Sequence, residues 1–251
     1  MYRPRIIPVL LLKDQVLVKS TRFKDHKYIG DPINAVSIFN GLRADELFVF
    51  DIEASKNKRL ISVDFVKEVG EEARMPFAVG GGVRTIDDIR RIVSAGAEKV
   101  VINTYAAQDP DFIKEASQTF GSSTIVVCID VKRKSFRGQR TWILGGDVPT
   151  QYTPKAFAQL MEKNGAGEIV IQSIEQDGTM DGYDINLVKS VATAVNIPVI
   201  ALGGAGKNDD LHDAYHHGHA NGMAAGSLHV YQSKKRGVLI NYPDRNELIF
   251  E

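Results

Sequence analysis

Apolar residues along the chain gather in eight short runs, and most of the runs are followed by a stretch of helical periodicity. The runs cover residues 5–12, 46–51, 77–83, 99–104, 124–130, 168–173, 198–202 and 222–227. The helical stretches cover residues 34–42, 64–72, 85–95, 111–119, 154–164, 184–195 and 209–217. Near-continuous apolar runs are typical of strands buried on both faces, and parallel strands need crossover helices. Eight such units in 251 residues predict an α/β fold, a single (βα)8 TIM barrel over residues 1–251, with an open doubly wound sheet as the alternative.

Two polar segments and the tail interrupt this alternation. The segment from Lys19 to Pro32 is too long for an ordinary connection between a strand and a helix, so we expect a mobile lid over a site, with a disordered basic loop as the alternative. A second excursion runs from Lys132 to Thr153 and holds the only tryptophan, Trp142. The tail after Ser233 is short and has room for one stub of helix.

The two halves of the chain, about 1–120 and 121–251, share three short sequence matches in the same order. Residues 9–13 match 128–132, residues 45–49 match 167–171, and residues 77–81 match 200–204, at offsets of 119, 122 and 123. Small loop insertions would produce this slow drift of the offset. We therefore predict a barrel built from two duplicated half-barrels, and coincidence among short apolar words is the alternative.

Consecutive glycines follow the third run, at Gly80–Gly82, and the seventh run, at Gly203–Gly204. A glycine lets backbone N–H groups approach an anion closely because it has no Cβ, and a helix that begins just beyond adds its positive end. In a doubled barrel the two loops lie on opposite sides of one mouth. They predict a ligand with a phosphate at each end, unless they are only tight turns.

A single acidic residue, Asp130, ends the fifth run, where barrels place catalytic groups. The matching position in the first half is Leu11. Two facing carboxylates act as general acid and base, and here an aliphatic side chain replaces one of them. A structural role for Asp130, such as a helix cap, is the alternative.

Composition narrows the classes of function. Lysine plus arginine and aspartate plus glutamate both total 31, which gives no support for nucleic-acid or membrane-surface binding. The single cysteine, Cys128, fits a reducing compartment, and we find no apolar run of membrane-spanning length, so we expect a cytoplasmic protein. Asp213, His216 and His217 have helical spacing but lie near a helix end, so we expect no metal site, and we expect no cofactor.

Motifs along nearly the whole chain resemble the HisF family, the cyclase subunits of imidazole glycerol phosphate synthase. They are Arg5–Ile7, Gly30–Pro32, Val79–Gly82, Ile102–Thr104, Thr119–Gly121, Gly165–Glu168, Asp177–Thr179, Gly182–Asp184 and Gly203–Lys207. The resemblance implies a (βα)8 barrel that takes ammonia from a HisH-like glutaminase docked at the barrel bottom. At the top, such a barrel converts a bis-phosphorylated ribulosyl substrate into imidazole glycerol phosphate and the aminoimidazole carboxamide ribotide.

The resemblance also assigns roles to individual residues. It implies catalytic roles for Asp130 and for the lid lysine Lys19. Together with the loop glycines Gly81 and Gly203, the implied phosphate ligands are Gly82, Asn103, Thr104, Asp177, Gly178, Gly204, Ala225 and Gly226. The implied ammonia gate is a charged ring of Arg5, Glu46, Lys99 and Glu168, which also has a simpler interpretation as a cap on the barrel bottom.

Several positions depart from the family pattern. Leu11 replaces its first catalytic aspartate, Val9 its cysteine, Gln172 its threonine and Leu202 its serine, and the last helix is truncated. These departures resemble the WbuZ-like branch, which works with a HisH-like glutaminase and a sugar-amidating enzyme in surface-polysaccharide pathways. We therefore expect ammonia relay for sugar amidination with a phosphorylated small-molecule substrate. A genuine cyclase of histidine biosynthesis is the main alternative, and a non-enzymatic scaffold or an isomerase of the ProFAR isomerase type are others.

Overall fold

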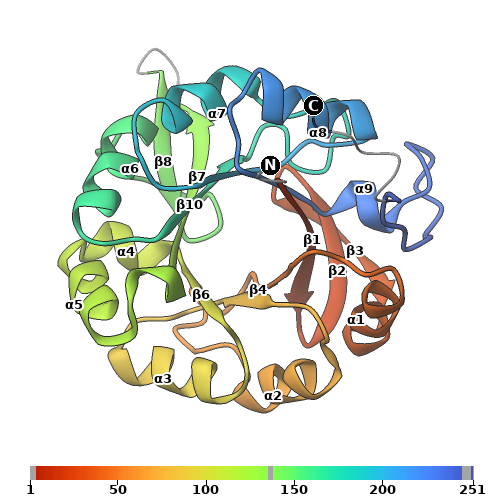
Figure 1. The fold of residues 1–251 in the computed structure, drawn as a ribbon, viewed down its shortest axis with the longest axis horizontal. Coiled ribbons are helices and arrows are strands. Elements are labelled where there is room, and N and C mark those ends of the chain that lie inside the picture. The colour runs from red at the N-terminus through yellow and green to blue at the C-terminus, as the bar shows by residue number, and fades with distance from the viewer. Residues whose placement is uncertain (1–3, 135–137, 245–249, 251) are drawn as a thin grey trace.

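Eight parallel strands form a closed ring in the computed structural model, which describes residues 4–134, 138–244 and 250 (Figure 1). The ring strands are β1 (Arg5–Lys13), β4 (Leu47–Asp51), β5 (Phe77–Gly80), β6 (Lys99–Ile102), β7 (Ile125–Arg133), β10 (Glu168–Ser173), β11 (Val199–Leu202) and β12 (Gly222–Ala225). Each strand pairs with its neighbour in chain order, β12 pairs with β1, and β7 pairs with β10 to complete the closure. The predicted (βα)8 barrel is confirmed, and the doubly wound sheet is excluded because the ring strands leave no open edge.

Helices surround this ring. They are α1 (Pro32–Gly41), α2 (Val63–Glu72), α3 (Ile86–Ser94), α4 (Thr104–Gln108), α5 (Asp111–Phe120), α6 (Pro154–Lys163), α7 (Ile185–Ala192), α8 (Asn208–His216), α9 (Ser227–Val230) and the 3₁₀ turn η1 (Ser122–Thr124). The seven predicted helices are confirmed to within a few residues at their ends. The sequence pattern missed α4, α9 and η1 because elements of three to five residues are too short to show a period.

The segment predicted as a lid forms a β-hairpin, so the alternative of a disordered basic loop is wrong, while its mobility stays a prediction. β1 continues past the ring and pairs antiparallel with β2 (Val16–Thr21), which pairs with β3 (Lys24–Gly30). Leu17 and Val18 are buried against the body of the protein, and Arg22 and Phe23 take positive φ at the turn. Apolar anchoring of one strand explains why a mostly polar stretch is ordered.

The second excursion has the same form. β7 also continues past the ring, and it pairs antiparallel with β8 (Gln139–Ile143), which pairs with β9 (Val148–Pro149). β1 and β7 lie four strands apart around the ring, so the two hairpins stand opposite each other. This places matching extensions on both halves, while the duplication of the halves stays a prediction.

The tail differs from its prediction. Between Ser233 and Asp244 the described chain contains no helix, and Tyr231 and Val238 form an isolated antiparallel bridge instead. Of the residues after Asp244, the structure describes only Phe250. A helix stub is therefore wrong for the described tail.

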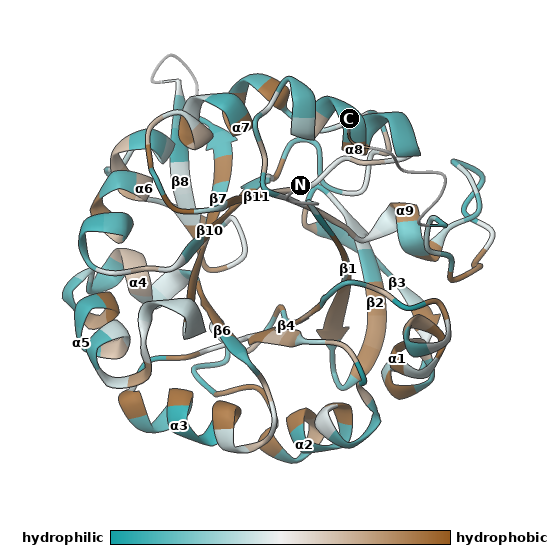
Figure 2. Ribbon diagram, in the orientation of Figure 1, coloured by the Kyte–Doolittle hydropathy of each residue, from teal (hydrophilic) through white to brown (hydrophobic). Residues whose placement is uncertain are grey.

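The core has two layers, one between the ring and the helices and one inside the ring. Apolar residues follow the strands and the inward sides of the helices, with hydrophilic residues outside (Figure 2). The inner layer consists of Ile7, Val9, Phe48, Ala78, Val101, Val126, Cys128, Val170, Ile200, Leu202 and Ala224. The lumen is therefore apolar from near one end of the strands to the other.

The capping box of α3 generates a stability prediction. The Thr85 hydroxyl accepts a hydrogen bond from the Asp88 amide at 3.1 Å, and the Asp88 carboxylate accepts one from the Thr85 amide at 2.9 Å. We expect Thr85→Ala to lower the free energy of unfolding by ~1 kcal/mol, because an amide of the first turn loses its acceptor.

Chemical denaturation measures this change. Thr119→Ala, which removes an exposed hydroxyl bonded only within its own helix, is the matched control and should change stability by less than ~0.5 kcal/mol. Equal effects of the two variants would contradict the assigned cap.

Candidate functional site

Four charged side chains meet where the strands begin. Arg5, Lys99 and Glu168 are the first residues of β1, β6 and β10, and Glu46 directly precedes β4. Arg5 forms ion pairs with Glu46 and, at 2.8 Å, with Glu168. Lys99 pairs with Glu46 at 2.9 Å and with Glu168 at 3.1 Å. The structure thus brings the four predicted gate residues together as one ring of alternating charge.

The side chains of this charge ring are largely buried, unlike those of an ordinary surface ion-pair network. The Glu46 side chain is 3% exposed, and each of the two carboxylates contacts both cations. Buried charges are tolerated when they are paired and hydrogen-bonded on all sides. The ring therefore closes the amino-terminal end of the apolar lumen with groups that are polar yet mutually neutralised.

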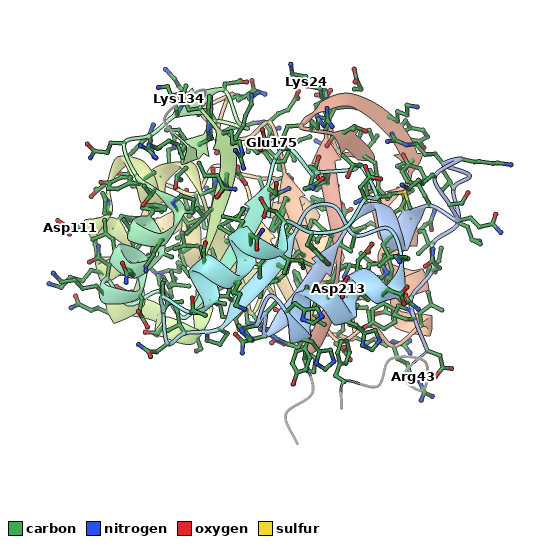
Figure 3. All side chains as sticks on the ribbon, turned by 90° about the horizontal axis from the view of Figure 1, so that it is seen from above. Lys24, Arg43, Asp111, Lys134, Glu175 and Asp213 are labelled. Atoms are coloured by element: carbon green, nitrogen blue, oxygen red, sulfur yellow. The ribbon has the colours of Figure 1, made fainter. Side chains whose placement is uncertain are left out.

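A cavity of about 530 Å³ opens at the other end, where the ring strands finish. Lys24, Lys134 and Glu175 lie at this end of the molecule, and Arg43 lies at the opposite end (Figure 3). The predicted site residues that line this cavity are Leu11, Gly81, Gly82, Asn103, Thr104 and Asp130. We call this cavity the mouth.

Asp130 is the acidic group of the mouth. It is 6% exposed, it lies beside Gln172 in the register between β7 and β10, and its Oδ1 accepts a hydrogen bond from Cys128 Sγ at 3.7 Å. Burial raises the pKa of Asp130 to about 7, the charge of Asp177 raises it further, and hydrogen bonds from Cys128 and Asn103 oppose the rise. A carboxyl group with such a pKa can both give and take a proton near neutral pH.

The first glycine loop packs tightly against the protein's own backbone beside the mouth. Gly82 has φ of +71°, and a Cβ there would lie 1.8 Å from the Arg59 carbonyl oxygen. The neighbouring predicted ligands are engaged within the protein: Asn103 Nδ2 donates to the Cys128 carbonyl at 2.9 Å, and Thr104 Oγ1 accepts from the Leu144 amide at 3.1 Å. An anion here would meet mainly backbone groups.

The second-half residues line a smaller cavity of about 20 Å³ next to the mouth. It contains the predicted residues Lys19, Asp177, Gly178, Gly203, Gly204 and Gly226, while Ala225 is not among its lining. Leu11 and Gln172 line both cavities, so the two sites are adjacent.

Lys19 is buried in this smaller cavity rather than carried on a loose lid. Its Nζ donates to the Val9 carbonyl at 2.5 Å, and a Cβ on Gly226 would lie 2.5 Å from it. Burial lowers the pKa of Lys19 to about 8, and the charge of Asp177 partly opposes this shift. An anion arriving beside this ammonium would raise the pKa of Lys19 again.

Asp177 does not have the groups expected of a phosphate ligand. Its amide donates to the Ser173 carbonyl at 3.0 Å, and its carboxylate accepts from Ser20 Oγ at 2.9 Å, the Phe23 amide at 3.4 Å and Gln172 Nε2 at 3.5 Å. Burial raises its pKa, and these hydrogen bonds oppose the rise. Its side chain fastens the β2–β3 hairpin to the barrel, which the sequence did not indicate.

Carboxylates bind the backbone amides of the residues that lead into the helices after the glycine loops. Asp88 accepts from the Arg84 and Thr85 amides, and Asp210 accepts from the Gly206 and Lys207 amides. The expectation that each following helix adds its positive end to an anion site stays a prediction, and a carboxylate lies at each of these helix starts. The sequence indicates these caps, because an acidic residue stands three positions after each N-cap residue, Thr85 and Lys207.

The segment predicted as a lid supplies part of the roof of the mouth, whereas the part from the second hairpin was missed because it comes from long-range contacts. Phe23 and His26 of one hairpin and Leu144 and Asp147 of the other line the cavity, and Lys56 pairs with Asp147 at 2.7 Å. Across the described ranges, no group of three or more His, Cys, Asp or Glu residues is placed to hold a metal ion. Those ranges also contain no helix with the length and apolar character needed to cross a membrane.

Comparison with known proteins identifies the family of this chain. A family model described as "Histidine biosynthesis protein" matches residues 5–234. A Pseudomonas aeruginosa protein named "Putative imidazole glycerol phosphate synthase subunit hisF2" is 43% identical over 248 residues, covering 99% of each chain. Similar proteins are named "Putative imidazole glycerol phosphate synthase subunit HisF" in Leptospira borgpetersenii (42% identity, 97% of this chain and 96% of the relative) and "Putative imidazole glycerol phosphate synthase subunit hisF3" in Vibrio vulnificus (39%, 98% and 95%). The resemblance to the HisF family is confirmed, and the chain belongs to the histidine biosynthesis protein family.

Proposed function

We propose that this chain is a HisF-like synthase subunit that receives ammonia from a HisH-like glutaminase at the charge ring and releases it at the mouth. The observation that carries the proposal is the arrangement along the barrel axis, with a neutralised ring of four charges, an apolar lumen and a polar mouth in that order. Neutral ammonia crosses an apolar layer far more cheaply than an ion does. The barrel thereby favours NH₃ over NH₄⁺ and over other solutes.

At the mouth, we propose a phosphorylated substrate held by the two glycine loops. Gly81 and Gly82 line the mouth, and the buried ammonium of Lys19 supplies a charge on the other side. Asp130 supplies a carboxyl group that exchanges a proton near neutral pH. The two cavities are adjacent, which suits a ligand with two anionic ends.

The end use of the ammonia that we propose is amidation or amidination of a sugar in surface-polysaccharide biosynthesis, with a sugar-amidating enzyme as a further partner. Leu11, which lines both cavities, and Leu202, which lines the smaller one, are aliphatic at two positions where the family places polar groups, and this argues against efficient ring closure. The second candidate is a genuine cyclase of histidine biosynthesis, favoured by the retained Asp130, Lys19 and glycine loops. We propose the cytoplasm as the place of action in both cases.

The charge ring gives the test of ammonia traffic. We expect Lys99→Ala, in the complex with the glutaminase, to change the rate of glutamine hydrolysis and to lower the share of amide nitrogen passed to the acceptor by ~10-fold, because Glu46 and Glu168 each lose one cation and the ring opens. Lys155→Ala on the exposed side of α6 is the matched control. An unchanged rate and an unchanged share in Lys99→Ala would remove the argument for a gate.

The cyclase activity of Leu11 variants distinguishes sugar amidation from histidine biosynthesis. With ammonium salts and the ribulosyl bis-phosphate, we expect turnover at least ~10²-fold below that of an ordinary cyclase, because one acid of the pair is missing. Leu11→Asp should raise the residual rate of turnover. Leu11→Asn should not, because asparagine has the shape of aspartate but cannot exchange a proton. Turnover of the unmodified protein at the level of an ordinary cyclase would instead favour histidine biosynthesis.

A further inference from the structure

Two arms stand on opposite sides of the mouth and are not needed to close the barrel. The first arm is the hairpin of β2 and β3, and the second is the end of β7 with β8 and β9. They meet above the cavity, where a Cβ on Gly146 of the second arm would lie 3.3 Å from the Phe23 ring of the first. The arms therefore present a shared outer surface around the place where the mouth opens.

This surface is basic although the chain as a whole is neutral. The first arm exposes Arg22, Lys24 and Lys27. The second arm carries Lys132, Arg133, Lys134 and Arg140, with Lys132 over the Trp142 ring at 4.9 Å. Among the residues that the structure describes, Lys24, Lys27, Arg133 and Lys134 take part in no ion pair. Of the acidic residues on the arms, Asp147 is paired with Lys56, and Asp25 is exposed beside Lys24, so basic groups remain in excess.

The arms also expose large apolar side chains and an unpaired strand edge. Tyr28 is 68% exposed at the end of the first arm, and Val148 is 42% exposed on the second. Within the described chain β3 pairs only with β2, so its other edge presents free backbone donors and acceptors. Exposed edges and large apolar side chains on a charged surface are typical of protein docking sites.

We propose that the two arms dock the protein that accepts the ammonia, through an acidic face of that protein laid across the mouth. This inference rests on the proposed function, because ammonia released at the mouth must pass to an acceptor without escaping to water. A small anion would use the charges alone and would leave Tyr28, Val148 and the β3 edge without a role. Attraction between opposite charges speeds docking and selects the partner, so the contact weakens as salt is added.

The test measures binding of the complex of this chain and its glutaminase to the sugar-amidating enzyme of the same organism, at low and at physiological salt. Lys24→Glu/Lys27→Glu on the first arm should weaken binding ~10-fold or more, and Arg133→Glu/Lys134→Glu on the second arm should do the same. Lys114→Glu/Lys155→Glu, an equal charge change on the exposed faces of α5 and α6, is the matched control. Tyr28→Ala keeps the charge and should also weaken binding. Glutamine hydrolysis and thermal unfolding of each variant show that the barrel and its glutaminase contact are intact.

Other outcomes overturn the inference. These are arm variants that bind as the unmodified protein does, a control that loses as much affinity as the arms, and no detectable binding at any salt concentration. Arm-dependent binding of single-stranded RNA or of a second copy of this chain in place of the enzyme also overturns it. The Lys99→Ala result distinguishes failure of this inference from failure of the proposed function. If ammonia transfer depends on Lys99 while docking through the arms fails, the proposed ammonia relay stands and only the docking inference is overturned.

Discussion

Closure of the sheet is the constraint on which the rest of this protein depends. When eight parallel strands pair in a ring, all their first residues meet at one end and all their last residues meet at the other. Glu46 and Lys99 can therefore pair across the barrel although 53 residues separate them. The same closure removes water from the lumen, which is why charges at either end must be paired or must shift their pKa.

The two ends of the barrel stabilise their buried charged groups in different ways. At the amino-terminal end each carboxylate has two cations, so the charges neutralise one another. At the mouth Asp130 has no cation beside it and is held instead by Cys128 and Asn103, with burial favouring its neutral form. Leu11 adds to the apolar surroundings, and Asp177, although it also raises the pKa of Asp130, is fixed by Ser20 and the hairpin. The mouth is thus a place for one exchangeable proton rather than for a symmetric acid pair.

Much of this could be predicted from the sequence, and the failures have physical causes. The ring strands and long helices follow from apolar periodicity, whereas the charge ring was expected from the resemblance to the HisF family. The sequence does not show that the Asp177 amide donates to Ser173 or that its carboxylate holds the β2–β3 hairpin, because these contacts depend on the fold. The hairpin form of the Lys19–Pro32 segment could not be predicted, because it comes from pairing with an extension of β1, a tertiary contact that overrides a polar composition.

The central claim is that the lumen is dry from the charge ring to the mouth, and the titration of Asp130 tests it most directly. Carbon-13 NMR of the aspartate side chains, assigned with Asp130→Asn, would follow the carboxyl group as the pH rises. We expect a midpoint of about 7, since burial disfavours the charged form, and the group should be protonated below that pH and ionised above it. A midpoint near ~4, the ordinary value for aspartate, would mean that water reaches the end of the lumen, and it would contradict the account.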